Sequence, residues 1–333
     1  MKKFLNILLA VIMLTVAAVS LVGCSDDATS NARAKGLVVN KNKDTGIYTV
    51  VSYNGTEKEL DLGKMLEDKG YSGKFKIKKG AFADNATIES LIIPDSVVEI
   101  QKGAFEKMIA LKSLEVPFVG KTVNADAEYK ESAPAEDKSV GSERTLAHFF
   151  GADKFKNSVS VTIAGTQCYL PGGFNTITVN ATKYFDDPND VKPEYYCIPY
   201  DAFSGATNLK FVTLKGDELG AIGENAFSGC DYITSITIPK TVKVIHENAF
   251  ENCDNLKEVK FADGASAIEI KDNAFKGCAK IDTFDSDTAK TVNLSKVSVI
   301  GDGALDFGRD AEYSVSGYTG DLAKVFGETK YKQ

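Results

Sequence analysis

Residues 222–245 read IGENAFSGCDYITSITIPKTVKVI, and the same pattern recurs along most of the chain. Six copies contain the dipeptide Ala-Phe and a seventh contains Ala-Leu; these dipeptides lie at 81–82, 104–105, 202–203, 226–227, 249–250, 274–275 and 304–305. Each copy has an isoleucine four residues before its alanine, and close-set copies are 23 to 25 residues apart. A period of this length predicts an array of stacked repeats rather than a closed globule.

Each repeat is expected to contribute one short strand. Apolar residues stand ten and twelve positions after the alanine, as in Ile236 and Ile238, and they alternate with residues that would face away from the core. Proline follows this segment at Pro94, Pro117 and Pro239 and would end the strand. A single copy cannot bury its apolar face, whereas stacked copies can. The pattern predicts a β-rich solenoid with a parallel sheet on one side and turns or short helical coils on the other.

The repeat resembles the BspA-type leucine-rich repeat of bacterial surface proteins. The resemblance rests on Ile-x3-Ala-Phe-x2-Cys-x2-Ile-x2-Ile-x-Ile-Pro-x2-Val-x2-Ile, from Ile222 to Ile245, and covers roughly residues 76–310. The Asn or Cys that usually follows the core of a leucine-rich repeat is missing, and these positions hold Ser96, Val119 and Thr241. The resemblance implies a leucine-rich-repeat solenoid and an exported, surface-facing interaction scaffold. It implies no particular ligand, because members of the class serve diverse ends.

Both ends of the array are expected to carry caps, because an open end exposes sheet edge and core. Residues 36–75 form the predicted N-terminal cap, in which Asn54-Gly55 would turn a hairpin between residues 46–53 and 56–62. The array itself spans residues 76–310. Residues 311–333 form the predicted C-terminal cap, with a short closing helix within residues 318–326.

An irregular insertion interrupts the period at residues 118–200. Its first part, residues 121–145, is polar and reads as a mobile segment. Val159–Ile163 and Ile177–Val179 both alternate and predict two further strands of the array. A second excursion, residues 184–196, is rich in acidic residues and proline. With these additions the array is expected to hold about eight or nine rungs.

The N-terminal residues have the features of an export signal. A basic start precedes an apolar run, residues 7–22, whose length of about 24 Å as a helix falls short of the ~30 Å hydrocarbon core. Residues 1–23 are therefore a predicted signal peptide. The run ends Leu21-Val22-Gly23-Cys24, which resembles the lipobox of bacterial lipoproteins and implies lipidation at Cys24 and membrane anchoring. Residues 24–35 would form a flexible tether, holding the protein outside the cytoplasm on a membrane that the sequence does not identify.

Composition narrows the possible functions. The formal charge of −7 argues against nucleic acid as a partner. His148 and His246 are the only histidines of the sequence, and neither belongs to a metal-ligand spacing. Because no nucleophile motif, phosphate loop or cofactor fingerprint occurs either, the sequence predicts a protein that is not an enzyme and needs no cofactor or metal.

The cysteines fall into two groups besides Cys24. Three stand four residues after a repeat alanine, where other copies hold Asn, Met or Ala; they are Cys230, Cys253 and Cys278. A metal site would not tolerate that exchange, so we interpret them as small core side chains. Cys168 and Cys197 lie in the insertion, and in an exported protein they could form a disulfide.

The outward positions of the predicted strands form a candidate binding face, rich in Ser and Thr. Its residues are Ser90, Ile92, Glu115, Thr162, Thr178, Phe211, Thr213, Ser235, Thr237 and Lys260. Such a face could be a plain solvated sheet, or it could bind a protein or glycan of the extracellular space or envelope, for example in adhesion. A structural envelope component without external ligand and an enzyme with its site in residues 118–200 remain alternatives. The ligand and the oligomeric state are open.

Overall fold

The computed structural model describes residues 36–122, 142–181, 196–308 and 311–332. Ala34–Gln333 form one compact unit. The predicted signal peptide, Cys24 and the tether lie outside the described residues, as do most of the polar segment 121–145 and of the excursion 184–196. No helix in the part of the chain that the structure describes is long and apolar enough to cross a membrane.

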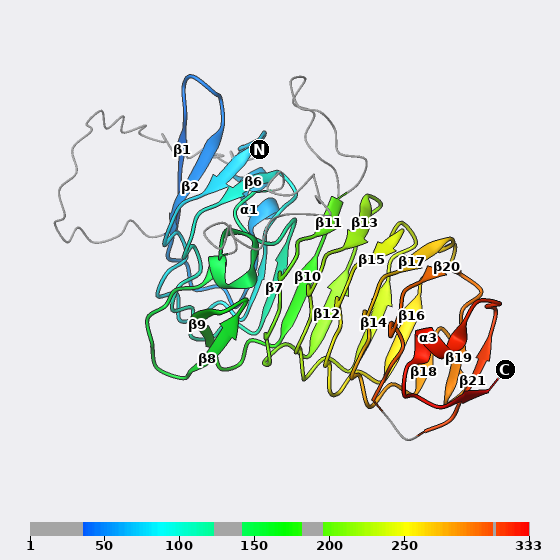
Figure 1. Ribbon diagram of the computed structural model, residues 1–333. Coiled ribbons are helices and arrows are strands. Elements are labelled where there is room, and N and C mark those ends of the chain that lie inside the picture. Colours follow the sequence, from blue (N-terminus) through cyan, green and yellow to red (C-terminus); the bar gives the residue numbers. More distant parts are fainter. Residues whose placement is uncertain (1–35, 123–141, 182–195, 309–310, 333) are drawn as a thin grey trace, which may run out of the picture. The chain divides into compact units, whose positions relative to one another are not determined.

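The strands after the Ala-Phe segments lie side by side in two parallel sheets, which together form one side of the array (Figure 1). One sheet has the order β12-β10-β7-β5-β3 and the other β14-β16-β18-β19-β21-β22. Their bounds are β3 Glu59–Asp61, β5 Ser90–Ile92, β7 Ser113–Val116, β10 Thr176–Val179, β12 Phe211–Leu214, β14 Ser235–Ile238, β16 Glu258–Phe261, β18 Thr283–Phe284, β19 Thr291–Asn293, β21 Tyr313–Ser316 and β22 Tyr331–Lys332. The predicted architecture is confirmed: a solenoid built mainly of parallel strands.

Each regular repeat contains a second strand that the sequence analysis did not predict. In the regular repeats these strands end at or near the isoleucine four residues before the alanine. Together with β1 and β2 of the N-terminal cap, of which β2 falls within the predicted hairpin segment 46–53, they form the sheets β1-β2-β4-β6 and β11-β13-β15-β17-β20. Their bounds are β1 Leu37–Lys41, β2 Tyr48–Tyr53, β4 Phe75–Ile77, β6 Val97–Ile100, β11 Tyr196–Ile198, β13 Leu219–Ile222, β15 Val244–Ile245, β17 Ile268–Ile270 and β20 Val297–Ile300. They are short and carry little alternation, which is why their period was not visible in the sequence.

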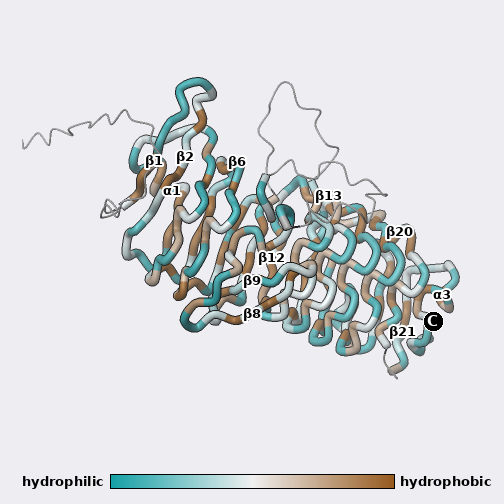
Figure 2. Tube along the Cα trace, turned by 60° about the vertical axis from the view of Figure 1, so that its left-hand side comes forward, coloured by the Kyte–Doolittle hydropathy of each residue, from teal (hydrophilic) through white to brown (hydrophobic). Residues whose placement is uncertain are grey.

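The Ala-Phe segments form a third line of contact between repeats. The N–H group of each phenylalanine except Phe105 donates to the alanine carbonyl of the next repeat, over 2.8 Å from Phe203 to Ala226 and 2.7 Å from Phe250 to Ala274. The phenylalanine rings are fully buried and follow one another through the core. Figure 2 shows the same alternation of hydrophobic and hydrophilic segments repeated along the tube. Every repeat therefore buries its apolar side against its neighbours, as the pattern predicted.

The caps differ from prediction in detail. The N-terminal hairpin pairs β1 with β2 in antiparallel fashion, so its turn lies at residues 42–47 and not at Asn54-Gly55. The segment after Asn54-Gly55 instead leads to β3, which adds to the parallel face, and to helix α1 (Leu62–Asp68). At the other end α3 (Leu322–Phe326) matches the predicted closing helix, starting after Asp321, whose carboxylate accepts from the N–H of Ala323. Both caps add strands, so the face has more rungs than the predicted eight or nine.

The insertion supplies one true array strand and one separate hairpin. β10 pairs with β7 and β12 as predicted. β8 (Ser158–Ile163) does not join the array; it pairs antiparallel with β9 (Thr166–Pro171) in a two-stranded sheet. A rung on the Ala-Phe side comes from the 3-10 segments Ser142–Arg144 and Leu146–Phe149, where the Phe149 carbonyl accepts from the N–H of Phe105.

The predicted disulfide between Cys168 and Cys197 is wrong. Cys168 is a free, buried thiol on β9 and belongs to the hydrophobic core. Cys197 lies on β11, whose partner in the parallel sheet is β13. The two cysteines therefore belong to different sheets, and a core position explains Cys168 without a bond.

Candidate binding face

The structure places every residue of the predicted face on the two parallel sheets except Thr162. Their side chains are exposed or half-buried, while the alternate residues, such as Val212 and Ile236, are buried. Register aligns the outward residues in rows: Thr178 lies between Glu115 and Thr213, and Thr237 lies beside Lys260. The alternation visible in the sequence therefore identified the outward side of the array correctly.

Thr162 is an error of the sequence analysis. It lies on β8, and the hairpin of β8 and β9 packs on the Ala-Phe side of the array, where the N–H of Ala164 donates to the Ser204 carbonyl over 3.1 Å. Gly205 makes this contact possible, because a Cβ atom there would approach the Thr162 carbonyl oxygen to 2.4 Å. Alternation alone could not distinguish a strand of the array from a strand of a separate hairpin.

The N-terminal part of the face is tied together by its own side chains. The Ser113 hydroxyl donates to that of Ser90 over 2.9 Å. Glu115 accepts from the Asn180 amide over 2.7 Å and pairs with Lys215 at 3.3 Å. These side chains are already paired within the sheet, so they have less capacity to bind a partner.

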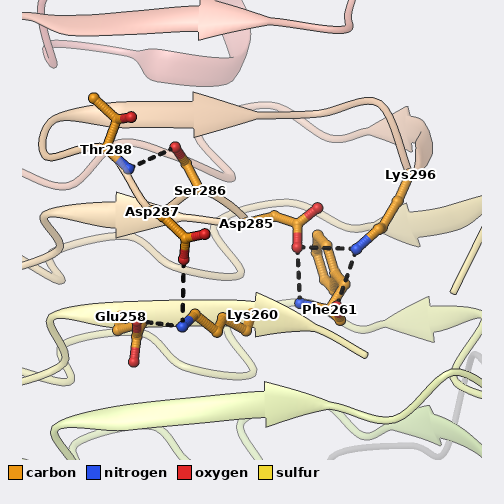
Figure 3. Close-up of polar contacts among 8 residues, drawn as sticks. All are labelled: Glu258, Lys260, Phe261, Asp285, Ser286, Asp287, Thr288 and Lys296. Carbon is orange, nitrogen blue, oxygen red and sulfur yellow. Dashed lines mark hydrogen bonds and ion pairs between the residues drawn. The ribbon is translucent and has the colours of Figure 1, made fainter. Parts of the chain in front are cut away.

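The C-terminal part of the face is also internally paired (Figure 3). Lys260 contacts Glu258 at 3.0 Å and Asp287 at 3.6 Å, and the hydrogen bond with Glu258, together with the charges, raises the pKa of its ammonium group. Asp285 accepts from the N–H of Phe261 and from the Lys296 ammonium, both at 3.1 Å. The Lys296 ammonium also donates to the Phe261 carbonyl at 3.0 Å. The side chains of Asp285 and Lys296 thus add hydrogen bonds to β16 beyond the two residues that pair with the short strand β18.

The middle of the face, between β12 and β14, is different. A cavity of about 270 Å³ opens there, which we call the β12/β14 slot; it is lined by Lys210, Phe211, Val212, Thr213, Leu214, Ser235 and Thr237. Phe211 is 49% exposed. Within the described residues, the side chains of Thr213, Ser235 and Thr237 make no hydrogen bond. The slot is thus the part of the face that offers unpaired hydroxyl groups, an exposed ring and a depression together.

The slot lies where the parallel ladder is interrupted. One sheet ends at β12 and the next begins at β14, and within the described residues no backbone hydrogen bond joins these two strands. On the other side of the array the same two repeats stay in contact, because β11 pairs with β13 and the rings of Phe203 and Phe227 stack at 4.9 Å. The hydrogen-bonded ladder is therefore interrupted only on the face, where β12 and β14 still lie side by side. Sequence reasoning named four slot residues but missed the interruption and Lys210.

Outside the slot, the described residues offer few groups suited to metal binding or nucleophilic chemistry. The described residues contain no group of three or more His, Cys, Asp or Glu side chains that could hold a metal ion. The thiols of Cys230, Cys253 and Cys278 are fully buried and donate to the carbonyls of Phe203, Phe227 and Phe250 at 3.0 to 3.2 Å. Burial raises the pKa values of the Cys230 and Cys253 thiols, which keeps them protonated and poorly nucleophilic.

Stacked repeats, each with two short strands and a buried Ala-Phe turn, define a leucine-rich-repeat protein. A family model described as the BspA type leucine rich repeat region matches residues 75–130 and 189–301 in six copies. The match covers just over half of the chain, so the protein belongs to this family. Such a repeat region is a scaffold, and the family suggests a surface repeat protein capable of binding other proteins. A comparison with curated proteins found no sequence match.

Solved structures of bacterial leucine-rich-repeat proteins are similar to this chain. The T. pallidum leucine-rich-repeat protein is 16% identical, covers 84% of this chain and 89% of its own, and has a TM-score of 0.35. A leucine-rich-repeat protein from Bacteroides ovatus is 15% identical, covers 86% and 71%, and has a TM-score of 0.35. A leucine-rich cell surface protein from Faecalibacterium prausnitzii is 19% identical, covers 84% and 74%, and has a TM-score of 0.33.

Proposed function

We propose that the protein is a membrane-tethered, extracytoplasmic scaffold that binds a protein partner non-covalently through the sheet face. The observation that carries this proposal is the β12/β14 slot: an exposed aromatic ring, unpaired hydroxyl groups and a depression lie together in the middle of a face whose two ends are internally paired. Aromatic side chains at the centre of a patch commonly dominate protein binding. The repeat family supports this type of function.

Binding is tested by probing arrays of extracellular-matrix proteins and of glycans with the full chain. A protein ligand found there should bind at least about tenfold more weakly to Phe211→Ala, since a central aromatic anchor contributes more than about 1.4 kcal/mol. Val299→Ala is the matched control, because Val299 is also 49% exposed but lies on β20, in the other set of sheets. Melting temperatures should be alike for all three proteins.

Three outcomes would contradict the proposal. Equal losses for Phe211→Ala and Val299→Ala would mean that the face is not the binding surface. Binding to glycans alone would replace the protein partner by a carbohydrate. The third outcome is no binding on either array, while the protein co-purifies with envelope proteins at fixed stoichiometry. This result would support the alternative of a structural envelope component.

The tether is a separate part of the proposal and rests on the sequence of residues 1–35. We expect Cys24→Ser to move the protein from the membrane fraction to the soluble fraction, because lipidation requires the thiol. Ser25→Ala is the control, since it leaves Cys24 intact. If the Cys24→Ser protein stays with the membrane, the anchoring proposal is wrong, whereas the proposal for the sheet face is unaffected.

A further inference from the structure

The repeat that contains β14 differs from the repeats on either side of it in a side chain that bridges neighbouring rungs. An asparagine six residues after the repeat alanine ties two repeats to the rung before them: Asn208 donates to the Phe174 carbonyl and Asn255 to the Asp231 carbonyl, both over 2.6 Å. In the repeat between these two, the same position holds Tyr232, which is 58% exposed. Within the described residues, the Tyr232 side chain makes no corresponding hydrogen bond to the rung before it.

The backbone shows the same interruption. The N–H of Lys210 donates to the Asn175 carbonyl over 2.8 Å, and the N–H of Lys257 donates to the Thr234 carbonyl over 2.9 Å. Within the described residues, no such bond connects Thr234 to Lys210. The facing edges of β12 and β14 thus present backbone N–H and C=O groups without a strand partner. Val212 and Leu214 below them are 8% and 7% exposed, more than Ile236 and Ile238 of β14.

The charge of the slot is positive. Among the described residues that line it, Lys210 alone is charged. Its ammonium group lies 5.2 Å from the centre of the Phe211 ring and, within the described residues, has no carboxylate partner. The remaining side chains that line the slot are uncharged. A partner that brings a carboxylate would therefore gain an ion pair without having to displace one already formed.

We propose that the β12/β14 slot is an anchor site for a peptide segment of a protein partner, which inserts an aromatic or aliphatic side chain beside Phe211 and places a neighbouring Asp or Glu against Lys210. This inference rests on the proposed function and specifies its ligand. The exposed Phe211 ring beside the Lys210 ammonium favours a peptide over a glycan, because a peptide can supply an apolar side chain and a carboxylate together. The apolar floor formed by Val212 and Leu214 favours an apolar side chain.

The test selects a displayed library of short linear peptides on the full chain and then measures affinities of the selected peptides. We expect the selected sequences to combine an acidic residue with an aromatic or aliphatic one. Lys210→Glu should weaken their binding at least about tenfold, because it reverses the charge that the peptide meets. Lys257→Glu is the matched control: Lys257 is also exposed and occupies the same repeat position, but lies outside the slot. Its effect should stay within about twofold.

A second variant tests the slot itself. Tyr232→Asn restores the amide that Asn208 and Asn255 supply in their repeats. The new amide should donate to the Thr207 carbonyl, which is the equivalent acceptor, and so bring β12 and β14 closer together. We expect slower amide hydrogen exchange in Phe211–Leu214 and Ser235–Ile238, and peptide binding at least about tenfold weaker. Because exchange reports closure directly, a misfolded variant is recognised by faster exchange throughout.

The outcomes separate the two proposals. Peptides that lack acidic residues, or that bind Lys210→Glu and Tyr232→Asn as well as the unaltered chain, would overturn the inference for the slot while leaving a protein-binding face intact. Failure to select any peptide, with a matrix protein still bound through Phe211, would also overturn it. Acidic glycans that bind in a Lys210-dependent way would replace the peptide. No binding to peptides or matrix proteins would remove both proposals.

Discussion

The two halves of the array stack their phenylalanines differently. In the C-terminal half the rings of Phe203, Phe227, Phe250 and Phe275 follow one another at 4.9 to 5.1 Å, and neighbouring ring planes differ by only 3 to 12°. In the N-terminal half Phe82, Phe105 and Phe149 lie 5.5 to 5.8 Å apart with planes inclined by 54 to 59°. The same dipeptide therefore packs in two ways within one chain.

The difference follows the residue four positions after the alanine. In the C-terminal half this position holds the small Ala206 in the first copy and, in the next three, a cysteine whose thiol donates to the phenylalanine carbonyl of the preceding repeat. In the N-terminal half it holds the larger Asn85 and Met108. The N-terminal half also takes one rung from the insertion, which supplies Phe149 from a differently built segment. Where the side chains around the rings are similar from copy to copy, the rings can stack in the same way. Where one of these side chains differs in size, the rings pack at other angles.

The largest expected effect is the removal of a ring from the regular stack. Phe250→Ala deletes a fully buried side chain that stacks on Phe227 and Phe275, so it should lower the free energy of unfolding by about 3–5 kcal/mol. Urea denaturation measures the change, and Phe211→Ala, at an exposed ring, should stay within about 0.5 kcal/mol. A cost below about 1 kcal/mol for Phe250→Ala would show that the stack does not hold this half together.

A smaller effect is expected at the position that distinguishes the halves. Asn85 donates to the Gly55 carbonyl at 3.1 Å and accepts from the N–H groups of Thr87 and Ile88 at 3.0 and 2.9 Å. Asn85→Ala leaves these groups without their partner and should cost about 1–3 kcal/mol in urea denaturation. Asn85→Asp keeps the acceptor but loses the donor, so its cost should reveal how much the link to the N-terminal cap contributes.

The equivalent change in the C-terminal half should cost less. Cys253→Ala removes one weak thiol donor, at 3.1 Å from the Phe227 carbonyl, and a small volume, so we expect about 1 kcal/mol. Calorimetric or urea unfolding of both variants gives the comparison. A cost for Cys253→Ala equal to or above that of Asn85→Ala would contradict the view that the thiol serves mainly as a small core side chain.

The smallest expected effect is a pH dependence confined to the N-terminal half. His148 lies in the rung from the insertion, with Nε2 at 2.8 Å from the Ile100 carbonyl, and burial lowers the pKa of its imidazole below the ordinary 6.5. The unfolded chain then binds a proton that the folded chain does not, so the free energy of unfolding should fall as the pH drops below about 6.5. Glu143 partly opposes this shift, while Lys102 and Lys121 reinforce it.

The measurement compares urea midpoints at pH 7.5 and at mildly acidic pH for the unaltered chain and for His148→Gln. The glutamine cannot titrate, so its variant should lose less stability on acidification. Amide exchange should locate the loss near Ile100 and Phe105, next to His148. An equal loss in both proteins, or a loss confined to the Cys253 repeats, would assign the pH dependence to other groups.

Sequence and structure agree best where a feature is periodic. Ile236 and Ile238 predicted a strand and its inward side, and the recurrent Ala-Phe pairs predicted a buried line of rings. Features that depend on a partner far away in the chain could not be predicted. β8 alternates like an array strand, but β9, three residues later, pairs with it first. Likewise Asn54-Gly55 is a good turn sequence, yet the strand that pairs with β2 precedes it in the chain.

The sequence by itself determined the repeat class, the inward and outward positions of each strand and the candidate residues Phe211, Thr213, Ser235 and Thr237, because a fixed period constrains every copy in the same way. Only the tertiary structure decided that Thr162 leaves the face, that Cys168 stays free and that the ladder opens between β12 and β14. These outcomes depend on contacts between repeats. Tyr232 in place of asparagine was visible in the sequence, but the bridge between rungs that this repeat lacks was visible only in the hydrogen bonds of Asn208 and Asn255.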